Sequence, residues 1–379
     1  MMVKGRFQIR VRGAPGRPAD PVEEDTPLPP FSPPRELLAA LRECQRPFLC
    51  THIYPDGDAL GSTAALALAL RSLGAEPTLL LTHPVPEKLL GADRGGLAAV
   101  IPGEPTDEQR AQIAAADRIF VLDTSEPDRL GRLREPVFAS PAPKTLIDHH
   151  ICEDRSIFDL AWSETESPST GNLVLRIVEE LAVPITPEIA EALFVAISTD
   201  TGWFRFSNAT PEAFRAAGVL REAGIDPEAL HRDLYETSTP ERTRALGEVL
   251  ARLETAGEGR VLYSTLRTTD LERHGIPLEE LDGFIDALKQ VRGAEIVFLV
   301  VELSPGRFKV SLRSKGAIDV HPIAASFGGG GHAKAAGCRL EGDDLTEDQV
   351  VEQLTRASLQ ILGLPATDHS PGTSGQPNA

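Results

Sequence analysis

The chain has 379 residues, of which 41% are hydrophobic and 25% charged, a composition typical of a folded protein with room for two domains. Its formal net charge is −18, which argues against binding of long duplex nucleic acid, because proteins of that class present a basic face. No apolar run reaches about 18 residues, so we expect no membrane span. The four scattered cysteines and the absence of a signal-peptide pattern favour a cytoplasmic protein.

The two ends of the chain differ in composition from the rest. Residues 1–34 end in the proline- and acid-rich stretch "APGRPADPVEEDTPLPPFSPP", and we predict a flexible extension there. Residues 366–379 predict a disordered tail for the same reason. The folded part is therefore expected to comprise a first domain at 35–230 and a second domain at 231–365.

The first half of the folded part alternates short apolar runs with helical patterns. Strands are predicted at 46–52, 77–83, 117–123 and 144–150, and helices at 62–74, 170–182 and 186–198. Such alternation indicates βαβ units, hence an α/β fold with a mainly parallel sheet flanked by helices. Gly57 and Gly61 are expected to permit a tight loop before the first of these helices, and Ser62 to cap it.

After about residue 236 the pattern changes. Strands are predicted at 259–266, 294–303 and 307–314, with a helix at 277–291 between the first two. We therefore expect a second, smaller C-terminal α/β domain. The boundary between the domains is placed at residues 225–240.

Several predicted strands end in residues that can bind a metal ion. In open parallel sheets, ligands bind beyond the carboxyl ends of the strands. A single aspartate at such a position is explained equally well as a turn former or helix cap. Convergence of several such residues on one edge of the sheet indicates a metal centre instead. The residues that converge are His52, Asp56, Asp123, Asp148, His149 and His150, joined by Asp200 after the helix at 186–198.

The mixture of imidazole and carboxylate groups indicates the kind of metal. Carboxylate-rich sites favour manganese or magnesium, whereas a structural zinc site would use cysteines. The set is too large for one octahedral ion that also keeps a water ligand. We therefore expect two ions about 3.5–4 Å apart that share a carboxylate and a bridging hydroxide. His52 and Asp56 would bind one ion and Asp58 the other, which would offset the repulsion between the carboxylates.

A run of four glycines in "FGGGGHAKAAG", residues 327–337, is the second conspicuous feature. It is either a flexible loop or a backbone nest for an anion, with "HAKAAG" beginning a helix whose positive end adds to the attraction. Upstream, the strand at 307–314 places Lys309 and Arg313 on one face. Lys309 and Lys315 are equally well explained as solvent-exposed charges, whereas Arg313 and His332 are favoured for phosphate contacts.

Aromatic residues gather in "GWFRF". Trp203, Phe204 and Phe206 could stack on a nucleobase, but packing at the junction of the domains is the favoured interpretation.

The motifs "HIYPDGDALGS", "VLDTSEPDRLG", "IDHH", "STDTGWFRFSNAT" and "FGGGGHAKAAG", in this order, resemble the DHH phosphoesterase superfamily in its branch with a C-terminal DHH-associated domain. They span residues 52–337, nearly the whole folded part. The compact two-domain size most resembles the nanoRNase type, which is both an oligoribonuclease and a 3′-phosphoadenosine-5′-phosphate phosphatase.

The resemblance implies a role for each motif residue, with manganese as the metal. One ion would be held by His52, Asp56 and Asp123, and the other by Asp58, Asp123, His149 and Asp200. Asp148 and His150 would be the catalytic pair, Asp148 steadying the histidines and His150 facing the substrate phosphate. The nucleotide would be bound, across a cleft between the domains, by Arg313, Gly329, Gly330, Gly331 and His332.

The implied function is hydrolysis of short oligoribonucleotides to mononucleotides, of 3′-phosphoadenosine-5′-phosphate to AMP, or of both. A cyclic or linear dinucleotide phosphodiesterase uses the same parts, and polyphosphate hydrolysis also stays open. A single-strand exonuclease is disfavoured by the acidic charge, and an inorganic pyrophosphatase by the GGGGH segment. A non-catalytic nucleotide-binding module is disfavoured by the intact set of ligands. Whether the protein forms a homodimer stays open.

Overall fold

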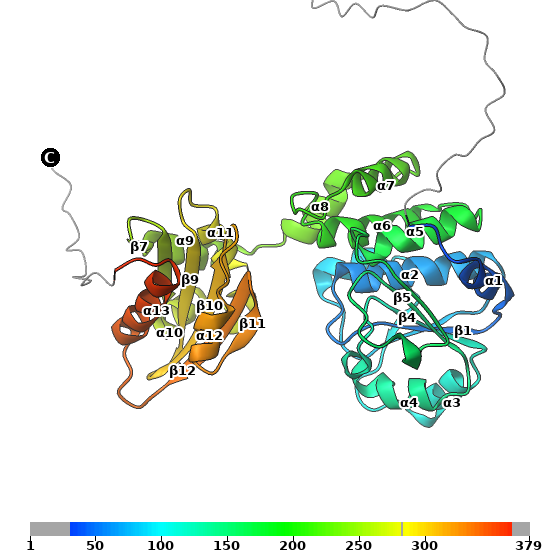
Figure 1. The fold of residues 1–379 in the computed structure, drawn as a ribbon, viewed down its shortest axis with the longest axis horizontal. Coiled ribbons are helices and arrows are strands. Elements are labelled where there is room, and N and C mark those ends of the chain that lie inside the picture. Colours follow the sequence, from blue (N-terminus) through cyan, green and yellow to red (C-terminus); the bar gives the residue numbers. More distant parts are fainter. Residues whose placement is uncertain (1–30, 282, 366–379) are drawn as a thin grey trace, which may run out of the picture. The chain divides into compact units, whose positions relative to one another are not determined.

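The computed structural model describes residues 31–281 and 283–365. The predicted tail lies outside these residues, as does the predicted extension apart from its last four positions. The chain divides into two compact units between Glu236 and Thr237, called unit 1 and unit 2 here (Figure 1). Within the described residues, no helix combines the length and apolar character that crossing a membrane requires.

Unit 1 is built on a six-stranded sheet in which all neighbouring strands run parallel. The order is β3-β2-β1-β4-β5-β6, so the direction in which strands are added reverses between β1 and β4. Open parallel sheets bind ligands at such a reversal. The strands are β1 (Pro47–Cys50), β2 (Thr78–Leu81), β3 (Ala98–Val100), β4 (Arg118–Leu122), β5 (Lys144–Asp148) and β6 (Leu160–Ser163).

Helices cover both faces of this sheet (Figure 1). One face packs against α1 (Arg35–Glu43), α2 (Gly57–Ser72), α5 (Thr170–Glu180) and α6 (Pro187–Asp200), with α7 (Pro211–Glu222) and α8 (Pro227–Tyr235) outside them. The other packs against α3 (Asp107–Ala114), α4 (Arg134–Ala139) and the 3₁₀ segment η2 (Pro127–Leu133). Two further 3₁₀ segments are η1 (Glu87–Asp93) and η3 (Arg155–Ile157). The parallel sheet and its four predicted strands are confirmed; the short β3 and β6 were not predicted.

Helix α2 begins at Gly57, five residues before the start of the predicted helix at 62. Its N-cap is Asp56, whose Oδ1 accepts a hydrogen bond from the Ala59 N–H at 3.0 Å, so the prediction that Ser62 caps the helix is wrong. The loop between β1 and α2 is therefore shorter than expected, and Asp58 lies in the first turn of the helix.

The two glycines of this segment serve helix packing, not a turn. A Cβ atom at Gly57 would lie 2.2 Å from Thr199 Oγ1, and one at Gly61 would lie 2.3 Å from the carbonyl oxygen of Ala192. Both contacts are with α6, so the missing side chains allow α2 and α6 to approach closely. The expectation of a glycine-dependent loop is thus corrected: both glycines lie inside the helix.

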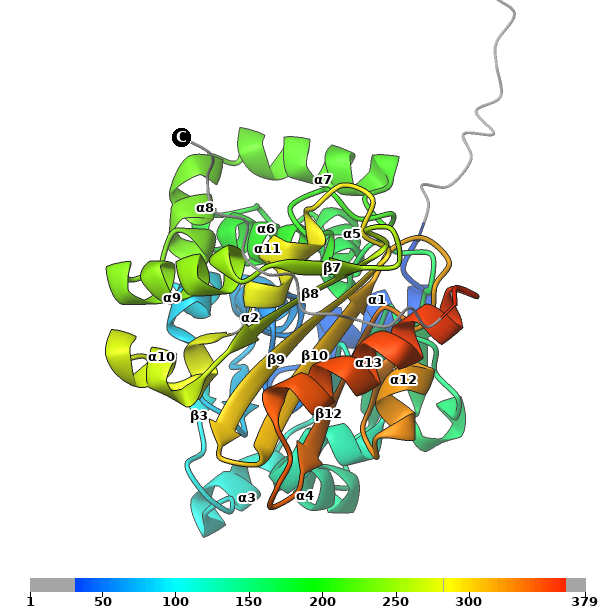
Figure 2. The same ribbon diagram turned by 90° about the vertical axis from the view of Figure 1, so that its left-hand side faces the viewer.

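Unit 2 contains a mixed six-stranded sheet of order β11-β12-β10-β9-β8-β7, in which only β8 and β9 pair in parallel within the described residues. The strands are β7 (Glu254–Ala256), β8 (Val261–Leu266), β9 (Ile296–Ser304), β10 (Arg307–Ser314), β11 (Gly330–His332) and β12 (Ala335–Glu341). One face packs against α9 (Pro240–Ala251), α10 (Thr268–His274) and α11 (Phe284–Lys289), and the other against α12 (His321–Ser326) and α13 (Glu347–Ile361) (Figure 2). The three predicted strands and the α/β class of this unit are confirmed.

Two helix predictions in unit 2 need correction. The helix expected at 277–291 is divided into a 3₁₀ segment, η4 (Leu278–Leu281), and α11, because Gly283 adopts a left-handed conformation with φ 84°. The segment "HAKAAG" does not begin a helix. It comprises the last residue of β11, the turn and the first three residues of β12 in the β11–β12 hairpin, in which Gly331 pairs with Ala336. A Cβ atom at Gly329 would lie 2.2 Å from the Gly337 carbonyl oxygen, so glycine is required by the close approach of the hairpin.

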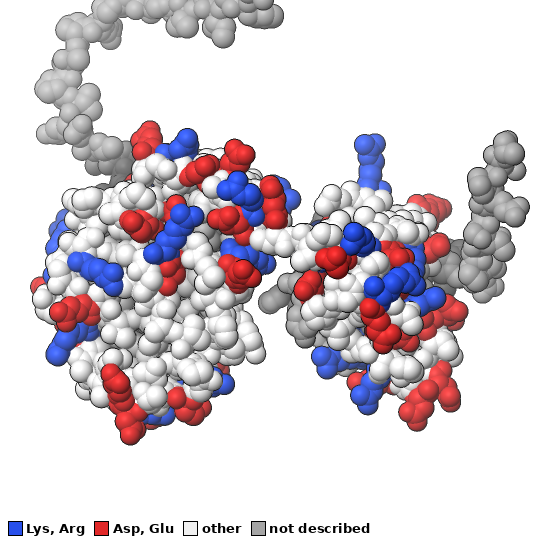
Figure 3. Space-filling model, turned by 180° about the vertical axis from the view of Figure 1, so that it is seen from behind, with Lys and Arg blue, Asp and Glu red and all other residues white. Residues whose placement is uncertain are grey.

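The charged side chains of unit 1 are interspersed by sign on the face seen in Figure 3. Among the described residues on that face, lysines and arginines alternate with acidic side chains and form no continuous basic patch. The lack of a continuous basic patch on this face agrees with the formal net charge of −18.

Candidate metal centre

The predicted metal-binding residues of unit 1 lie together at the carboxyl edge of its sheet. They come from the two strands that flank the reversal of strand order, from β5, and from the helices next to them. His52 and Asp56 follow β1, Asp58 lies in the first turn of α2, Asp123 follows β4, Asp148 ends β5 and precedes His149 and His150, and Asp200 ends α6.

A first group of ligand atoms surrounds His52. Its Nε2 lies 3.5 Å from Asp123 Oδ2 and 3.9 Å from Asp56 Oδ1. Its Nδ1 lies 2.7 Å from the carbonyl oxygen of Ile53, which can only accept, so Nδ1 carries the proton. Nε2 therefore presents a lone pair toward the two carboxylates, which is the tautomer that a metal ligand needs.

A second group surrounds His149. Its Nε2 lies 3.7 Å from Asp58 Oδ2, 3.7 Å from Asp123 Oδ1 and 3.8 Å from Asp200 Oδ2. This nitrogen is buried and has no hydrogen-bond partner among the described residues. Two atoms bonded to one ion at about 2.1 Å lie at most about 4.2 Å apart, so these separations fit a shared cation.

Asp123 connects the two groups, because Oδ2 faces His52 and Oδ1 faces His149. Its backbone has φ 61°, a left-handed conformation that aspartate tolerates better than most residues. Its N–H donates to the carbonyl oxygen of Ile147 on β5 at 3.1 Å. The donor set therefore fits two cations that share one carboxylate.

The first turn of α5 orients two of these carboxylates, and the sequence motifs did not reveal this. Both Asp58 oxygens accept backbone N–H groups, from Thr170 at 2.7 Å and from Gly171 at 2.8 Å. The Thr170 hydroxyl donates to Asp123 Oδ1 at 2.9 Å. The positive end of the helix thus attracts the buried carboxylates. The only signal in the sequence was a serine–threonine–glycine run, residues 169–171, at the start of the helix predicted at 170–182.

The buried carboxylates repel one another. Burial raises the pKa of Asp58 well above its usual value, and the charges of Asp123, Asp200 and Asp56 raise it further. Burial also raises the pKa of Asp200 to about 6, against the opposing influence of His149. For Asp123 burial acts in the same direction, but the neighbouring histidines outweigh it and its pKa is lowered. The cluster therefore carries negative charge that bound cations would neutralise.

Asp148 contacts His150, not His149. Its Oδ1 accepts hydrogen bonds from the His150 N–H at 3.1 Å and from His150 Nδ1 at 2.9 Å. This contact raises the pKa of His150 to about 9, with smaller contributions from Asp123 and Asp200. His149 instead lies with Nδ1 3.4 Å from the carbonyl oxygen of Ser167. The side chain of His150 is 50% exposed.

Two of the predicted substrate residues of unit 2 lie on strands that pair with the same strand, β12. Arg313 on β10 and His332 on β11 both pair with Ala335 of β12, from opposite sides. Residues in register on adjacent strands project from the same face, so the two side chains flank a single alanine. Gly330 and Gly331 belong to β11. Gly329 lines a cavity of about 400 Å³ together with Lys309, Ser311 and Arg339.

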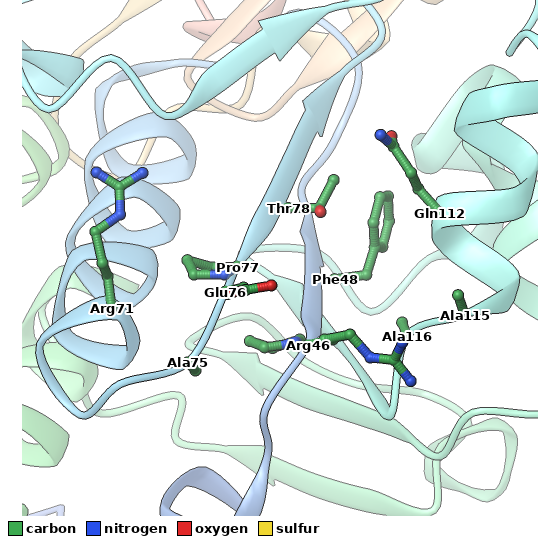
Figure 4. A pocket seen from close by; sticks show the side chains of 11 residues that line it. Arg46, Phe48, Arg71, Ala75, Glu76, Pro77, Thr78, Gln112, Ala115 and Ala116 are labelled. Carbon is green, nitrogen blue, oxygen red and sulfur yellow. The ribbon is translucent and has the colours of Figure 1, made fainter.

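A cavity of about 430 Å³ lies at the opposite, amino-terminal edge of the unit 1 sheet (Figure 4). It is lined by Arg46 and Phe48 around the start of β1, by Arg71 of α2 and by Gln112 of α3. The two arginine side chains extend away from each other in Figure 4. None of the predicted site residues lines this cavity, so it is separate from the metal centre.

Comparison with known proteins relates both units to described domains. Residues 47–197 match the DHH family, N-terminal domain, and residues 258–361 match the DHHA1 domain. The bifunctional oligoribonuclease and PAP phosphatase NrnA of Thermus thermophilus is 30% identical over 344 residues, 89% of this chain and 99% of that protein. The probable bifunctional oligoribonuclease and PAP phosphatase NrnA of Streptococcus mutans is 22% identical over 83% of this chain and 97% of its own length.

A solved structure shares the fold. The crystal structure of an exopolyphosphatase-related protein from Bacteroides fragilis aligns with a TM-score of 0.72 and 24% identity, over 86% of this chain and 96% of that one.

Proposed function

This chain belongs to the DHH family of phosphoesterases that carry a DHHA1 domain, and on that premise we propose that it hydrolyses short oligoribonucleotides to mononucleotides and 3′-phosphoadenosine-5′-phosphate to AMP. The names of the Thermus thermophilus and Streptococcus mutans relatives support these substrates. The observation that carries the proposal is the position of Asp123 between two groups of ligand atoms at the reversal of strand order.

The proposed cofactor is a pair of manganese ions. His52, Asp56 and Asp123 would hold one ion, and Asp58, Asp123, His149 and Asp200 the other. When bound, the ions would neutralise charge on the phosphoryl oxygens and lower the pKa of the attacking water. The first turn of α5 keeps Asp58 and Asp123 in place for this task through its N–H groups and the Thr170 hydroxyl.

Two cationic side chains of unit 1 would bind the phosphate directly. His150 is held through Nδ1 by Asp148, so its Nε2 is the nitrogen that can donate to a phosphate oxygen. Arg129 on η2 lies close enough to His52 to act on its pKa: burial and, least of all, Arg129 lower that pKa, but Asp123, the Ile53 carbonyl oxygen and Asp56 outweigh them and it is raised. Within the described residues no acidic side chain forms an ion pair with Arg129, so its charge is available to a substrate.

The shared face of Arg313 and His332 would bind a further phosphate of the nucleotide. Short RNA and small nucleotides suit such a site, because a few local cations suffice for them. A long duplex would instead need an extended basic surface.

The test is a manganese-supplemented assay in which RNA di- and trinucleotides, 3′-phosphoadenosine-5′-phosphate, cyclic di-AMP and pyrophosphate are offered in parallel and the products are separated by chromatography. The proposal expects mononucleotides from the RNA and AMP from the phosphoadenosine. The double variant with His149→Ala and Asp200→Ala should lose both activities while circular dichroism reports an intact fold.

Other outcomes would change the assignment. Hydrolysis of cyclic di-AMP alone would identify a cyclic dinucleotide phosphodiesterase, and hydrolysis of pyrophosphate alone would exclude a nucleotide substrate. Full activity of the double variant would contradict the role of the metal centre. Manganese binding without turnover of any substrate would indicate a nucleotide-binding module.

A further inference from the structure

Tyr54 is an exposed aromatic residue inside the loop that supplies the metal ligands. It lies between His52 and Asp56, and 72% of its surface is exposed. Its backbone has φ 52°, in the left-handed region that bulky residues rarely adopt. The exposure shows that this side chain contributes little to packing. Strained residues that persist at the edge of a site point to a functional constraint.

The ring of Tyr54 is supported by one neighbour, His83. The two ring centroids lie 4.0 Å apart with an angle of 40° between the planes. His83 follows β2, and its Nδ1 lies 3.1 Å from the hydroxyl of Thr82, whose side chain is buried. The hydroxyl of Thr82 thus fixes the imidazole of His83. Tyr54 follows β1 and His83 follows β2, so the aromatic pair connects the ends of two adjacent strands.

The loop that carries Tyr54 is also anchored. The Ile53 N–H donates to the Arg129 carbonyl oxygen at 2.7 Å, and a Cβ atom at Gly131 would lie 2.6 Å from Ile53 Cγ2. Because η2 packs this closely against the loop, the position of Tyr54 relative to His52 is fixed. An aromatic surface therefore stands on the β2 side of the loop that carries His52 and Asp56.

We propose that Tyr54, supported by His83, is the surface on which the base next to the hydrolysed phosphate stacks. This inference rests on the proposed function and adds the feature that distinguishes nucleotides from base-free phosphates. Every base has a π-face, so stacking on tyrosine binds different bases with similar strength. Pyrophosphate and polyphosphate have no base and gain nothing from this surface.

Other apolar side chains of unit 1 are less suited to this role. Trp203 and Phe204 are partly buried, and Phe206, which is 56% exposed, packs its ring over Gly202. Trp203 and Phe204 contact Phe194, and Trp203 also contacts His231 and Tyr235, so their rings are already engaged in packing. Ile151, which follows His150, is 78% exposed but has no aromatic ring. The variant Ile151→Ala is therefore compared with Tyr54→Leu in the experiment.

The experiment compares two ligands by calorimetry on the full chain loaded with manganese. Adenosine 5′-monophosphate and ribose 5-phosphate carry the same phosphate and sugar, and only the first has a base. The wild type is expected to bind adenosine 5′-monophosphate about 5- to 150-fold more tightly, the range that stacking of one base provides. Tyr54→Leu should bring this ratio close to one, whereas Tyr54→Phe should keep it.

Two further variants separate stacking from folding. Tyr54→Asn is expected to bind adenosine 5′-monophosphate and ribose 5-phosphate with similar affinity. Its melting temperature should not fall, because asparagine tolerates the left-handed conformation. Phe214→Leu removes another exposed aromatic ring of unit 1, 56% exposed on α7, and is expected to keep the ratio.

A wild type that hydrolyses dinucleotides but binds both ligands equally would overturn this inference and leave the proposed function standing. Loss of the ratio in Ile151→Ala but not in Tyr54→Leu would also overturn it. If the protein neither hydrolyses dinucleotides nor binds adenosine 5′-monophosphate, both the inference and the proposed function are wrong.

Discussion

The side-chain amide of Asn208 donates hydrogen bonds to Asp200 at both its carboxylate, Oδ2 at 3.2 Å, and its backbone carbonyl oxygen at 3.2 Å. The same amide donates to the Pro168 carbonyl oxygen at 3.0 Å. Asn208 thus ties the end of α6 to the segment before α5. This contact matters because Gly202, Trp203 and Phe204 all have positive φ, so the helix itself does not continue past Asp200 to hold it.

Asn208→Ala is expected to weaken the ion that Asp200 would bind. Partners that orient a metal ligand typically contribute a factor of about 10–100 in affinity. Titration of the metal-free protein with manganese, followed by calorimetry, measures both ions in one experiment. The ion that His52 and Asp56 would hold is the internal control and should bind as before. Equal weakening of both ions would show that Asn208 acts only on the fold.

Gly61→Ala is expected to destabilise unit 1 by about 1–3 kcal/mol, because overpacking forces the backbone to move. The added Cβ atom would meet a backbone oxygen of α6 at 2.3 Å, and no side chain can turn aside to relieve that contact. Gly91→Ala is the matched control, since a Cβ atom there has nothing within 4 Å. Urea unfolding of the two variants measures the difference. Equal stability of both would contradict the packing role of Gly61.

The metal-free protein is expected to lose stability as the pH rises through about 6. The pKa of Asp200 is about 6 in the folded state against 3.8 for an ordinary aspartate, so the protonated form stabilises the fold below pH 3.8. That contribution, about 2–3 kcal/mol, is lost above the folded pKa. Manganese affinity should change in the opposite direction, because the ligand must be ionised.

Urea unfolding in the presence of a chelator, at a series of pH values, measures this effect. Asp200→Asn cannot titrate and should reduce the dependence between pH 4 and 7, leaving the part that comes from Asp58 and His150. An unchanged slope in this variant would assign the dependence to other groups.

Arg129→Ala is expected to lower kcat/KM for dinucleotides by about 10- to 100-fold, the usual cost of losing a hydrogen bond to a charged group. Arg129→Lys should recover part of the loss, because it restores the charge without the planar fork. The control is Arg132→Ala on the same 3₁₀ segment. The side chain of Arg132 is exposed, and the proposed function does not require it. Equal losses for Arg129→Ala and Arg132→Ala would point to disruption of η2.

Asp270 stabilises unit 2 at neutral pH. It is 1% exposed, accepts a hydrogen bond from Arg252 Nη2 at 2.8 Å and another from the Arg267 N–H at 2.9 Å. The Arg252 contact lowers its pKa from 3.8 to about 2. The resulting stability, about 2 kcal/mol, is present above pH 3.8 and is lost as the pH falls through 2.

Asp270→Asn should therefore destabilise unit 2 at pH 7 by a similar amount, measured by thermal unfolding. Glu241→Gln removes an acid from an exposed ion pair with Arg244 and is expected to change stability by less than about 1 kcal/mol. A larger effect of Glu241→Gln would contradict the importance assigned to burial.

The sequence alone determined the parallel sheet and the candidate ligands. Local periodicity distinguishes strand from helix, and the residues that follow the strands meet at one edge wherever parallel strands pair. His52, Asp123 and His149 therefore lie together, as predicted. The strand and helix patterns of unit 2 also predicted its α/β class.

Only the tertiary structure decided how these side chains are held. Asp58 reaches the N–H of Thr170, 112 residues away, and Tyr54 meets His83 from the next strand. The glycines near residue 330 form a hairpin strand because β12 is there to pair with them, although their propensity favours a loop. Such contacts depend on packing between distant segments, which no local pattern encodes. The sequence thus specified which residues meet at the site, and the fold specified their conformations and partners.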